Sequence, residues 1–191
     1  RQVFDALDAS AKKHDHKLIS ASASEGTLGR QHLFELLELV DQSPYVYVLE
    51  TNGMTLGDDP EFAQQLARFR NLHVRVSIKG TSPEEYHTLT GARASSYALP
   101  FCALEHLIAA GVSCNACVTV SFSTDEGIER VRERLAAIRP GILTSLELEH
   151  ITLFPKVAKR LREAGITPRA VRHRGRIVHL ENIPTIKGAT Q

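Results

Sequence analysis

Groups that could hold a small charged ligand recur where three apolar segments of the sequence end. The set combines two carboxylates, an amide, hydroxyls and an amine: Glu25, Glu50, Thr51, Asn52, Ser77 and Lys79. Glycines follow closely, and they permit sharp turns and a close approach of backbone to a ligand. Lys79 can pair with a carboxylate, whereas Glu25 and Asn52 can take an ammonium group or hydroxyls. The set favours a zwitterion or a carboxylate as ligand; the alternative is that these residues only form turns.

The cysteines and histidines do not complete the ligand set of a known metal site. Cys114 and Cys117 form a CxxC pair, as in some metal and redox sites. Both fall in a predicted strand, where residues three apart point to opposite faces, and no second pair completes a four-ligand site. The run from His14 to His16 lies at the opposite end of the layer from the expected ligands. We expect structural cysteines, a solvated linker and no metal ligands.

Several common catalytic motifs are missing from the sequence. It contains no GxGxxG, GxxxxGK[ST], G-x-S-x-G or HExxH. Dinucleotide, P-loop, hydrolase and zinc-protease functions therefore lack the motifs that carry them. An aldolase-like use of Lys79 as a Schiff-base amine stays open, although such chemistry needs an amine of lowered pKa and Arg75 alone does not establish that environment.

The segments that must position these residues alternate between strand and helix. Strands are predicted at residues 17–22, 45–51, 73–79, 114–122 and in a last unit from about 146, and helices at 4–13, 33–40, 62–69, 99–110 and 128–138. Ser123 and Glu126 have the spacing of a capping box before the last of these helices. Strands that alternate with helices in this way form parallel βαβ units with right-handed crossovers.

The third predicted strand distinguishes between a doubly wound sheet and a barrel. Its apolar and polar residues alternate, with Val74, Val76 and Ile78 on one face and Arg75, Ser77 and Lys79 on the other. A doubly wound central strand is apolar on both faces, whereas a wide barrel has helices outside and a polar lumen inside. We predict an α/β fold, a partial, open (β/α) barrel of about five parallel strands with outer helices. Because no strand precedes the opening helix, we expect a first βα unit to be missing.

Length and charge limit the other possibilities. A chain of 191 residues fits a single domain, 1–191, which we divide into a barrel of about 1–165 and a C-terminal extension of about 166–191. The basic residues are scattered and the formal net charge is only +1, which argues against a nucleic-acid partner. No apolar run is long enough to cross a membrane, so we expect no membrane partner and a cytoplasmic location.

Four segments resemble motifs of the radical S-adenosylmethionine superfamily. They are KLISASASEGTLG (17–29), LETNG (49–53), VRVSIKG (74–80) and VTVSF (118–122). They are similar to a branch related to the pyruvate formate-lyase activating enzyme, with motifs of the form R-I-S-G-G-E-P-T-L-G, E-T-N-G and V-S-x-K-G. Their order and spacing match, and the likeness covers residues 4–165.

The resemblance implies a partial (β/α)6 barrel, a 4Fe-4S cluster held by CxxxCxxC and S-adenosylmethionine bound to it. It implies cofactor-binding roles for eight residues. The segment that meets the methionine amine falls on Ala23, Ser24 and Glu25, the E-T-N-G turn falls on Glu50, Thr51 and Asn52, and Ser77 and Lys79 would face the ribose and carboxylate. A protein substrate and an electron donor are the further partners that the family implies.

The sequence departs from the family's motifs at two points. It contains no CxxxCxxC, so the cluster ligands are not present in this chain, and its cysteines lie far downstream of the first barrel unit. Ala23 and Ser24 replace two glycines, which adds side-chain bulk where the family brings backbone close to the cofactor. A missing amino-terminal segment explains only the first departure, whereas a degenerate barrel explains both.

Two functions follow from the resemblance and its departures. The first is the core of a radical S-adenosylmethionine protein, an oxidoreductase or activating enzyme that would reductively cleave S-adenosylmethionine once a cluster-bearing segment is supplied, and that is inactive as the isolated chain. The alternative is a degenerate, non-catalytic barrel that acts as a binding or scaffold module. The sequence does not identify a substrate, because in this fold segments outside the shared motifs select it.

Overall fold

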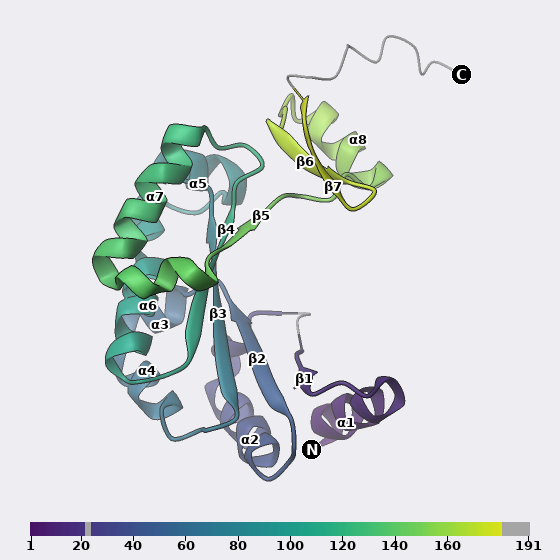
Figure 1. Cartoon of the computed structure of the whole chain (residues 1–191), viewed down its shortest axis with the longest axis vertical. Coiled ribbons are helices and arrows are strands. Elements are labelled where there is room, and N and C mark those ends of the chain that lie inside the picture. The colour runs from purple at the N-terminus through teal and green to yellow at the C-terminus, as the bar shows by residue number, and fades with distance from the viewer. Residues whose placement is uncertain (22–23, 181–191) are drawn as a thin grey trace.

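A single five-stranded sheet organises the chain. The computed structural model describes residues 1–21 and 24–180 (Figure 1). Its strands are β1 (Leu18–Ile19), β2 (Val46–Thr51), β3 (Leu72–Lys79), β4 (Cys114–Thr119) and β5 (Glu147–Glu149). They lie in the order β1-β2-β3-β4-β5, and every neighbouring pair is parallel. The sheet curls without closing, which confirms the prediction of a partial, open barrel.

Helices connect the strands and cover one face of the sheet. They are α1 (Gln2–His14), α2 (Arg30–Asp41), α3 (Met54–Asp58), α4 (Pro60–Leu66), α5 (Pro83–Thr90), α6 (Leu99–Ala109), α7 (Asp125–Ile138) and α8 (Pro155–Glu163), with 3-10 turns η1 (Gly26–Gly29), η2 (Ala94–Ala98) and η3 (Pro140–Ser145). Helices α3, α4, α6 and α7 lie together on the convex side, and the other face of the sheet is open (Figure 1). In the described residues no helix combines the length and the apolar character needed to cross a membrane.

Strand β3 shows why the sheet has two different faces. Its residues alternate between buried and partly exposed along the whole strand. Val74, Val76 and Ile78 are each 0% exposed beneath the helices, as their spacing predicts. Burying a Val or Ile side chain contributes about 1.5 to 3 kcal/mol, so the apolar face fixes the register of the strand.

Close packing of α3 against α6 completes the convex layer. A Cβ atom at Gly57 would collide with the backbone carbonyl of Leu99, so only glycine allows this approach. Phe62 and Phe101 are fully buried in the same layer. The core therefore lies between the sheet and its outer helices, and the lumen is left to polar side chains.

Two details differ from the sequence-based expectation. The first strand is only two residues long, and Ser20 lies beyond its end. Helix α7 is capped by Thr124, whose hydroxyl accepts from the Gly127 amide at 3.1 Å, so the predicted capping box at Ser123 is wrong. Ser123 instead donates to Glu85 at 2.7 Å, because that hydroxyl faces the neighbouring turn.

The last part of the described chain forms a hairpin beside α8. Strands β6 (Ala170–His173) and β7 (Arg176–His179) pair antiparallel, and positive φ angles of 48° and 79° at Arg174 and Gly175 form the two-residue turn. The amide of Arg169 donates to the carbonyl of Ser121 at 2.7 Å, and the amide of Arg172 donates to that of Ile151 at 2.8 Å. These bonds attach the hairpin where β4 and β5 end (Figure 1).

Candidate functional site

The open face of the sheet carries a layer of polar and charged side chains. The strand register places them in three rows: Glu50–Arg75–Asn115, Ser77–Cys117–Glu147 and Lys79–Thr119–Glu149. Members of one row come from different βα units. The parallel pairing therefore brings charges that are distant in the sequence onto one concave surface.

Arg75 is the centre of this layer. Its guanidinium lies 2.6 Å from Glu149, 2.7 Å from Glu147 and 3.3 Å from Glu50. Its hydrogen bonds with Glu147 raise the pKa of Arg75 and are the main cause that lowers the pKa of Glu147. Burial acts to raise the pKa of Glu149, but hydrogen bonds from Arg75 and Cys117 outweigh it and the pKa is lowered. One guanidinium faces three carboxylates, so this part of the lumen suits a cationic group.

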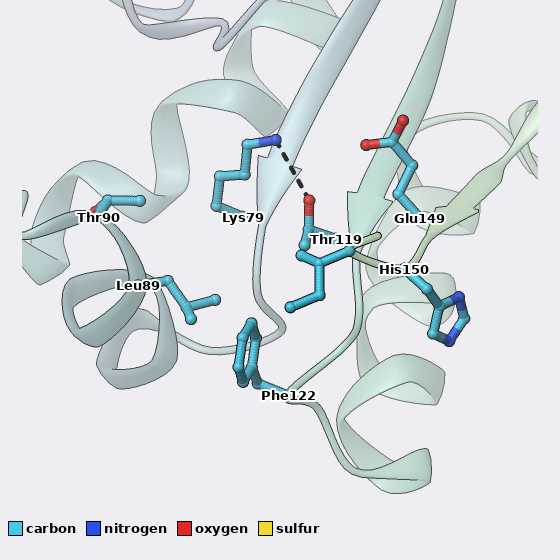
Figure 2. Close-up of a pocket in the computed structure, with 8 residues that line it drawn as sticks. Lys79, Leu89, Thr90, Thr119, Phe122, Glu149 and His150 are labelled. Atoms are coloured by element: carbon cyan, nitrogen blue, oxygen red, sulfur yellow. Dashed lines mark hydrogen bonds between the residues drawn. The ribbon is translucent and has the colours of Figure 1, made fainter. Parts of the chain in front are cut away.

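A pocket of about 450 Å³ opens at the carboxyl ends of β3, β4 and β5 (Figure 2). The Lys79 ammonium donates to the Thr119 hydroxyl at 3.3 Å, and Leu89 and Phe122 provide apolar walls. The lining comprises Lys79, Leu89, Thr90, Thr119, Phe122, Glu149, His150 and Ile151. Its volume lies within the roughly 300 to 1,000 Å³ that is typical of small-molecule sites. Carboxyl ends of parallel strands are also where ligands bind in such folds.

Three buried polar side-chain atoms have no hydrogen-bond partner among the described residues: the hydroxyls of Ser20 and Ser77 and Nδ1 of His150. Ser77 lies on the lumen face of β3, and His150 lines the pocket. Burial is the main cause that lowers the pKa of His150, and the charges of His179 and Arg172 add to it. An unpaired buried polar group costs about 1 to 3 kcal/mol, so a ligand or water that paired with these atoms would stabilise the site.

Glu25 ties the turn after β1 to the end of β2. Its Oε1 accepts from the hydroxyls of Thr27 and Thr51, both at 2.7 Å, and its Oε2 accepts from the Asn52 amide at 2.7 Å. Thr51 is buried on the helix side of the sheet, and the Asn52 side chain accepts from the Met54 amide at 2.9 Å. These groups therefore shape the edge of the barrel through bonds to one another.

The predicted site residues divide into two places along the same edge. Ser24 and Glu25 line a second pocket, also about 450 Å³, between α1 and η1. Ser77 and Lys79 lie on the lumen face of β3, with Glu50 beside Arg75. Ala23 lies outside the described residues. The structure thus places the described candidates at the carboxyl edge, but it does not bring all of them together.

Some residues of the site escaped the sequence analysis. Glu147, Glu149, Phe122 and His150 are contributed by β5 and by the loops that follow β4 and β5. The alternation Glu147-Leu148-Glu149 is the pattern of a strand with one polar face, and it could have indicated the two carboxylates. Only the strand pairing shows that they meet Arg75.

The cysteines do not fit a 4Fe-4S cluster. Cys102 lies on α6, whereas Cys114 and Cys117 are buried in β4. Burial raises the pKa of Cys114, and burial together with a hydrogen bond to Glu149 raises that of Cys117 to about 12. Cluster ligands are thiolates, whereas burial favours the neutral thiol form of Cys114 and Cys117. Single ligand atoms of Cys117, Glu147 and Glu149 lie within 4.8 Å of one another, and Arg75 already donates a hydrogen bond to each of the three.

The comparisons with known proteins report a similarity of fold. No protein-family model matches the sequence, and no curated protein matches it. A solved structure of native anSMEcpe with bound AdoMet superposes with a TM-score of 0.50 at 17% identity, over 85% of this chain and 50% of that one. The complex of native anSMEcpe with AdoMet and the Cp18Cys peptide gives 0.48 at 22% identity, over 72% and 40% of the two chains. This chain therefore spans about half the length of the first matched chain, and at this identity the likeness concerns the fold.

Proposed function

We propose that this chain is the core of a radical S-adenosylmethionine protein and that its lumen binds the cofactor at the ends of β3, β4 and β5. The observation that carries the proposal is the pocket at Lys79, which opens onto the polar face of a half-barrel. The fold likeness to anSMEcpe with bound AdoMet supports it, as does the order of the four sequence motifs.

The lumen offers groups of opposite charge to such a zwitterionic ligand. Lys79 would pair with the carboxylate, and the unpaired Ser77 hydroxyl would bind a ribose hydroxyl. Glu50, Glu147 and Glu149 surround a single arginine, and their surplus negative charge would favour the ammonium and sulfonium groups. Glu25 acts as a positioning residue, because its oxygens already hold Thr27, Thr51 and Asn52.

Finer aspects of the function belong to the same proposal. The motif order supports the branch related to the pyruvate formate-lyase activating enzyme, and that branch implies a protein substrate and an electron donor. The chain itself performs no reductive cleavage, because its thiols do not form a cluster site. Anaerobic incubation with iron and sulfide should therefore leave it colourless. A brown protein with 4Fe-4S signals would contradict our assignment of the cysteines.

Calorimetric titration with S-adenosylmethionine tests the cofactor site. We expect the wild-type chain to bind with a dissociation constant below about 1 mM, equivalent to about −4 kcal/mol. Lys79→Ala should weaken binding at least about tenfold, because it removes one charge-assisted contact. Lys13→Ala, which removes an exposed lysine from α1, is the matched control and should bind like the wild type. Absence of binding by the wild type, or unchanged affinity in Lys79→Ala, would refute the site.

A non-catalytic binding module is the second candidate. The specific observation in its favour is the lumen floor, where Arg75 is paired with Glu147 and Glu149 and also donates to the Cys117 sulfur. Under this hypothesis the pocket binds a small anion or nucleoside without any dependence on the sulfonium charge. Titration with S-adenosylhomocysteine, which lacks that charge, separates the two: equal affinity for both ligands would favour the binding module, whereas a clear preference for the sulfonium would favour the first proposal.

A further inference from the structure

The positive charge of this protein is concentrated at one end of the described structure. Residues 155–180, which we call the C-terminal basic unit, contain eight Lys and Arg and one acidic residue, Glu163. Residues 1–154 have the opposite balance, with 14 basic and 20 acidic residues. The net charge of +1 is thus the sum of an acidic barrel and a strongly basic unit, whose charges nearly cancel.

All eight basic side chains of this unit are exposed. Four of them lie in α8: Lys156, Lys159, Arg160 and Arg162. The other four lie in or directly before the β6–β7 hairpin: Arg169, Arg172, Arg174 and Arg176. Lys159 lies 3.7 Å from Glu163, the one acidic residue of the unit. Positive charges gathered on one small unit repel one another, so an anionic partner would stabilise the unit.

An exposed aromatic ring lies directly before the unit in the sequence. Phe154 immediately precedes α8 and is 63% exposed. A base can stack on such a ring, and stacking beside a basic surface is how proteins bind single-stranded nucleic acids. An acidic peptide would use the charges but would have little use for the ring. Six of the eight basic residues are arginines, whose planar guanidinium matches phosphate oxygens in a bidentate geometry.

The unit lies next to the pocket in the lumen. Ile151 lines the pocket and accepts a backbone hydrogen bond from Arg172 at 2.8 Å, and Ser121, between β4 and Phe122, accepts one from Arg169 at 2.7 Å. Figure 1 shows the hairpin and α8 beyond the ends of β4 and β5. A nucleic-acid strand bound to the basic unit would therefore pass close to the mouth of the pocket.

We propose that α8 and the β6–β7 hairpin, with Phe154, form a binding surface for single-stranded nucleic acid. The phosphates contact the arginines of the hairpin and the basic face of α8, and a base stacks on Phe154. The proposal reverses the expectation drawn from the whole-chain charge. It does not depend on S-adenosylmethionine binding.

Fluorescence anisotropy with labelled 20-nucleotide oligouridylate RNA and oligothymidylate DNA tests the surface. At low salt we expect micromolar affinity, and the logarithm of the association constant should fall linearly with the logarithm of salt concentration. Arg174→Asn combined with Arg176→Gln should reduce that slope by about 1.4, since each single-strand phosphate contact contributes about 0.7. Asn is chosen because it tolerates the positive φ at position 174. The ratio of the two affinities shows whether the surface prefers RNA or DNA.

Variants of Phe154 show whether the surface binds nucleic acid or another kind of anion. Phe154→Ala and Phe154→Leu should each weaken oligonucleotide binding roughly tenfold while leaving the salt slope unchanged. Lys13→Gln combined with Arg70→Gln removes two exposed charges from the barrel and should change nothing. Absence of binding by the wild type would overturn the proposal. Unaltered binding in the Phe154 variants, together with equal competition by polyglutamate, would also overturn it and would assign the surface to an acidic protein.

Discussion

At the scale of single residues, Arg75 decides whether the lumen floor is stable. Replacing it by glutamine leaves Glu147, Glu149 and Glu50 facing one another without their cation. The carboxylates are partly exposed, so water screens their repulsion. We therefore expect the free energy of unfolding to fall by about 2 kcal/mol, less than the loss when one partner of a fully buried ion pair is removed. Urea denaturation measures it. Arg70→Gln, an exposed arginine outside this network, is the control and should have no effect.

The same network predicts how stability depends on pH. The pKa values of Glu147 and Glu149 are lowered in the folded protein. Their contribution is therefore fully present above the unfolded carboxyl value of about 4.3 and is lost as pH falls through the lowered folded values. Arg75→Gln should lack this acid-sensitive contribution, so the stabilities of wild type and variant should converge in acid. If the plots of unfolding free energy against pH for the wild type and Arg75→Gln stayed parallel between pH 6 and pH 3, the lowered pKa values could not be assigned to the contacts with Arg75.

Thiol reactivity tests the account of the cysteines. Burial raises the pKa of Cys114 and is the main cause that raises the pKa of Cys117 to about 12, so we expect both thiols to react more slowly than an exposed cysteine at pH 8. Cys102, which is only partly buried, should be the first site alkylated by iodoacetamide. Peptide mapping by mass spectrometry should find Cys114 and Cys117 modified only after denaturation. Rapid labelling of Cys117 in the native protein would contradict its buried, protonated state.

At the scale of elements, consecutive residues of strand β3 face the core and the lumen in turn. Val76 is 0% exposed beneath the helices, so Val76→Asp buries an unpaired carboxylate and should cost several kcal/mol, enough to unfold most of the chain. Ser77→Ala at the next position is the matched control, and it should cost little because its hydroxyl makes no hydrogen bond within the described residues. Thermal melts followed by circular dichroism measure both. A stable Val76→Asp would be incompatible with the face assignment.

At the scale of the whole molecule, ligand binding should stabilise the fold. A ligand at 100 times its dissociation constant adds about 2.7 kcal/mol. For a chain of this size that corresponds to an increase in Tm of roughly 5 to 10 °C. We expect this shift with S-adenosylmethionine in differential scanning fluorimetry, and a smaller one in Lys79→Ala at the same concentration. A wild-type Tm that is independent of ligand concentration would speak against any cofactor site in the lumen.

The sequence alone determined the local structure and the kind of fold. Alternation of apolar and polar residues in β3 specified one buried and one polar face, since side chains of a strand alternate with a period of two. That pattern, repeated between helical stripes, was sufficient to predict an open half-barrel. It placed Ser77 and Lys79 on the polar face correctly, because their direction depends only on their own strand.

Tertiary structure decided which groups meet and which surfaces are left over. Arg75 and Glu149 are 74 residues apart, and only the pairing of β3, β4 and β5 brings them to 2.6 Å. Thr51 donates to Glu25, 26 residues away in the sequence, and no local pattern reveals this contact. The position of the basic unit beside the pocket likewise follows from hydrogen bonds between residues distant in the chain. Local periodicity encodes the direction of a side chain, whereas its partners depend on long-range packing that a linear pattern does not contain.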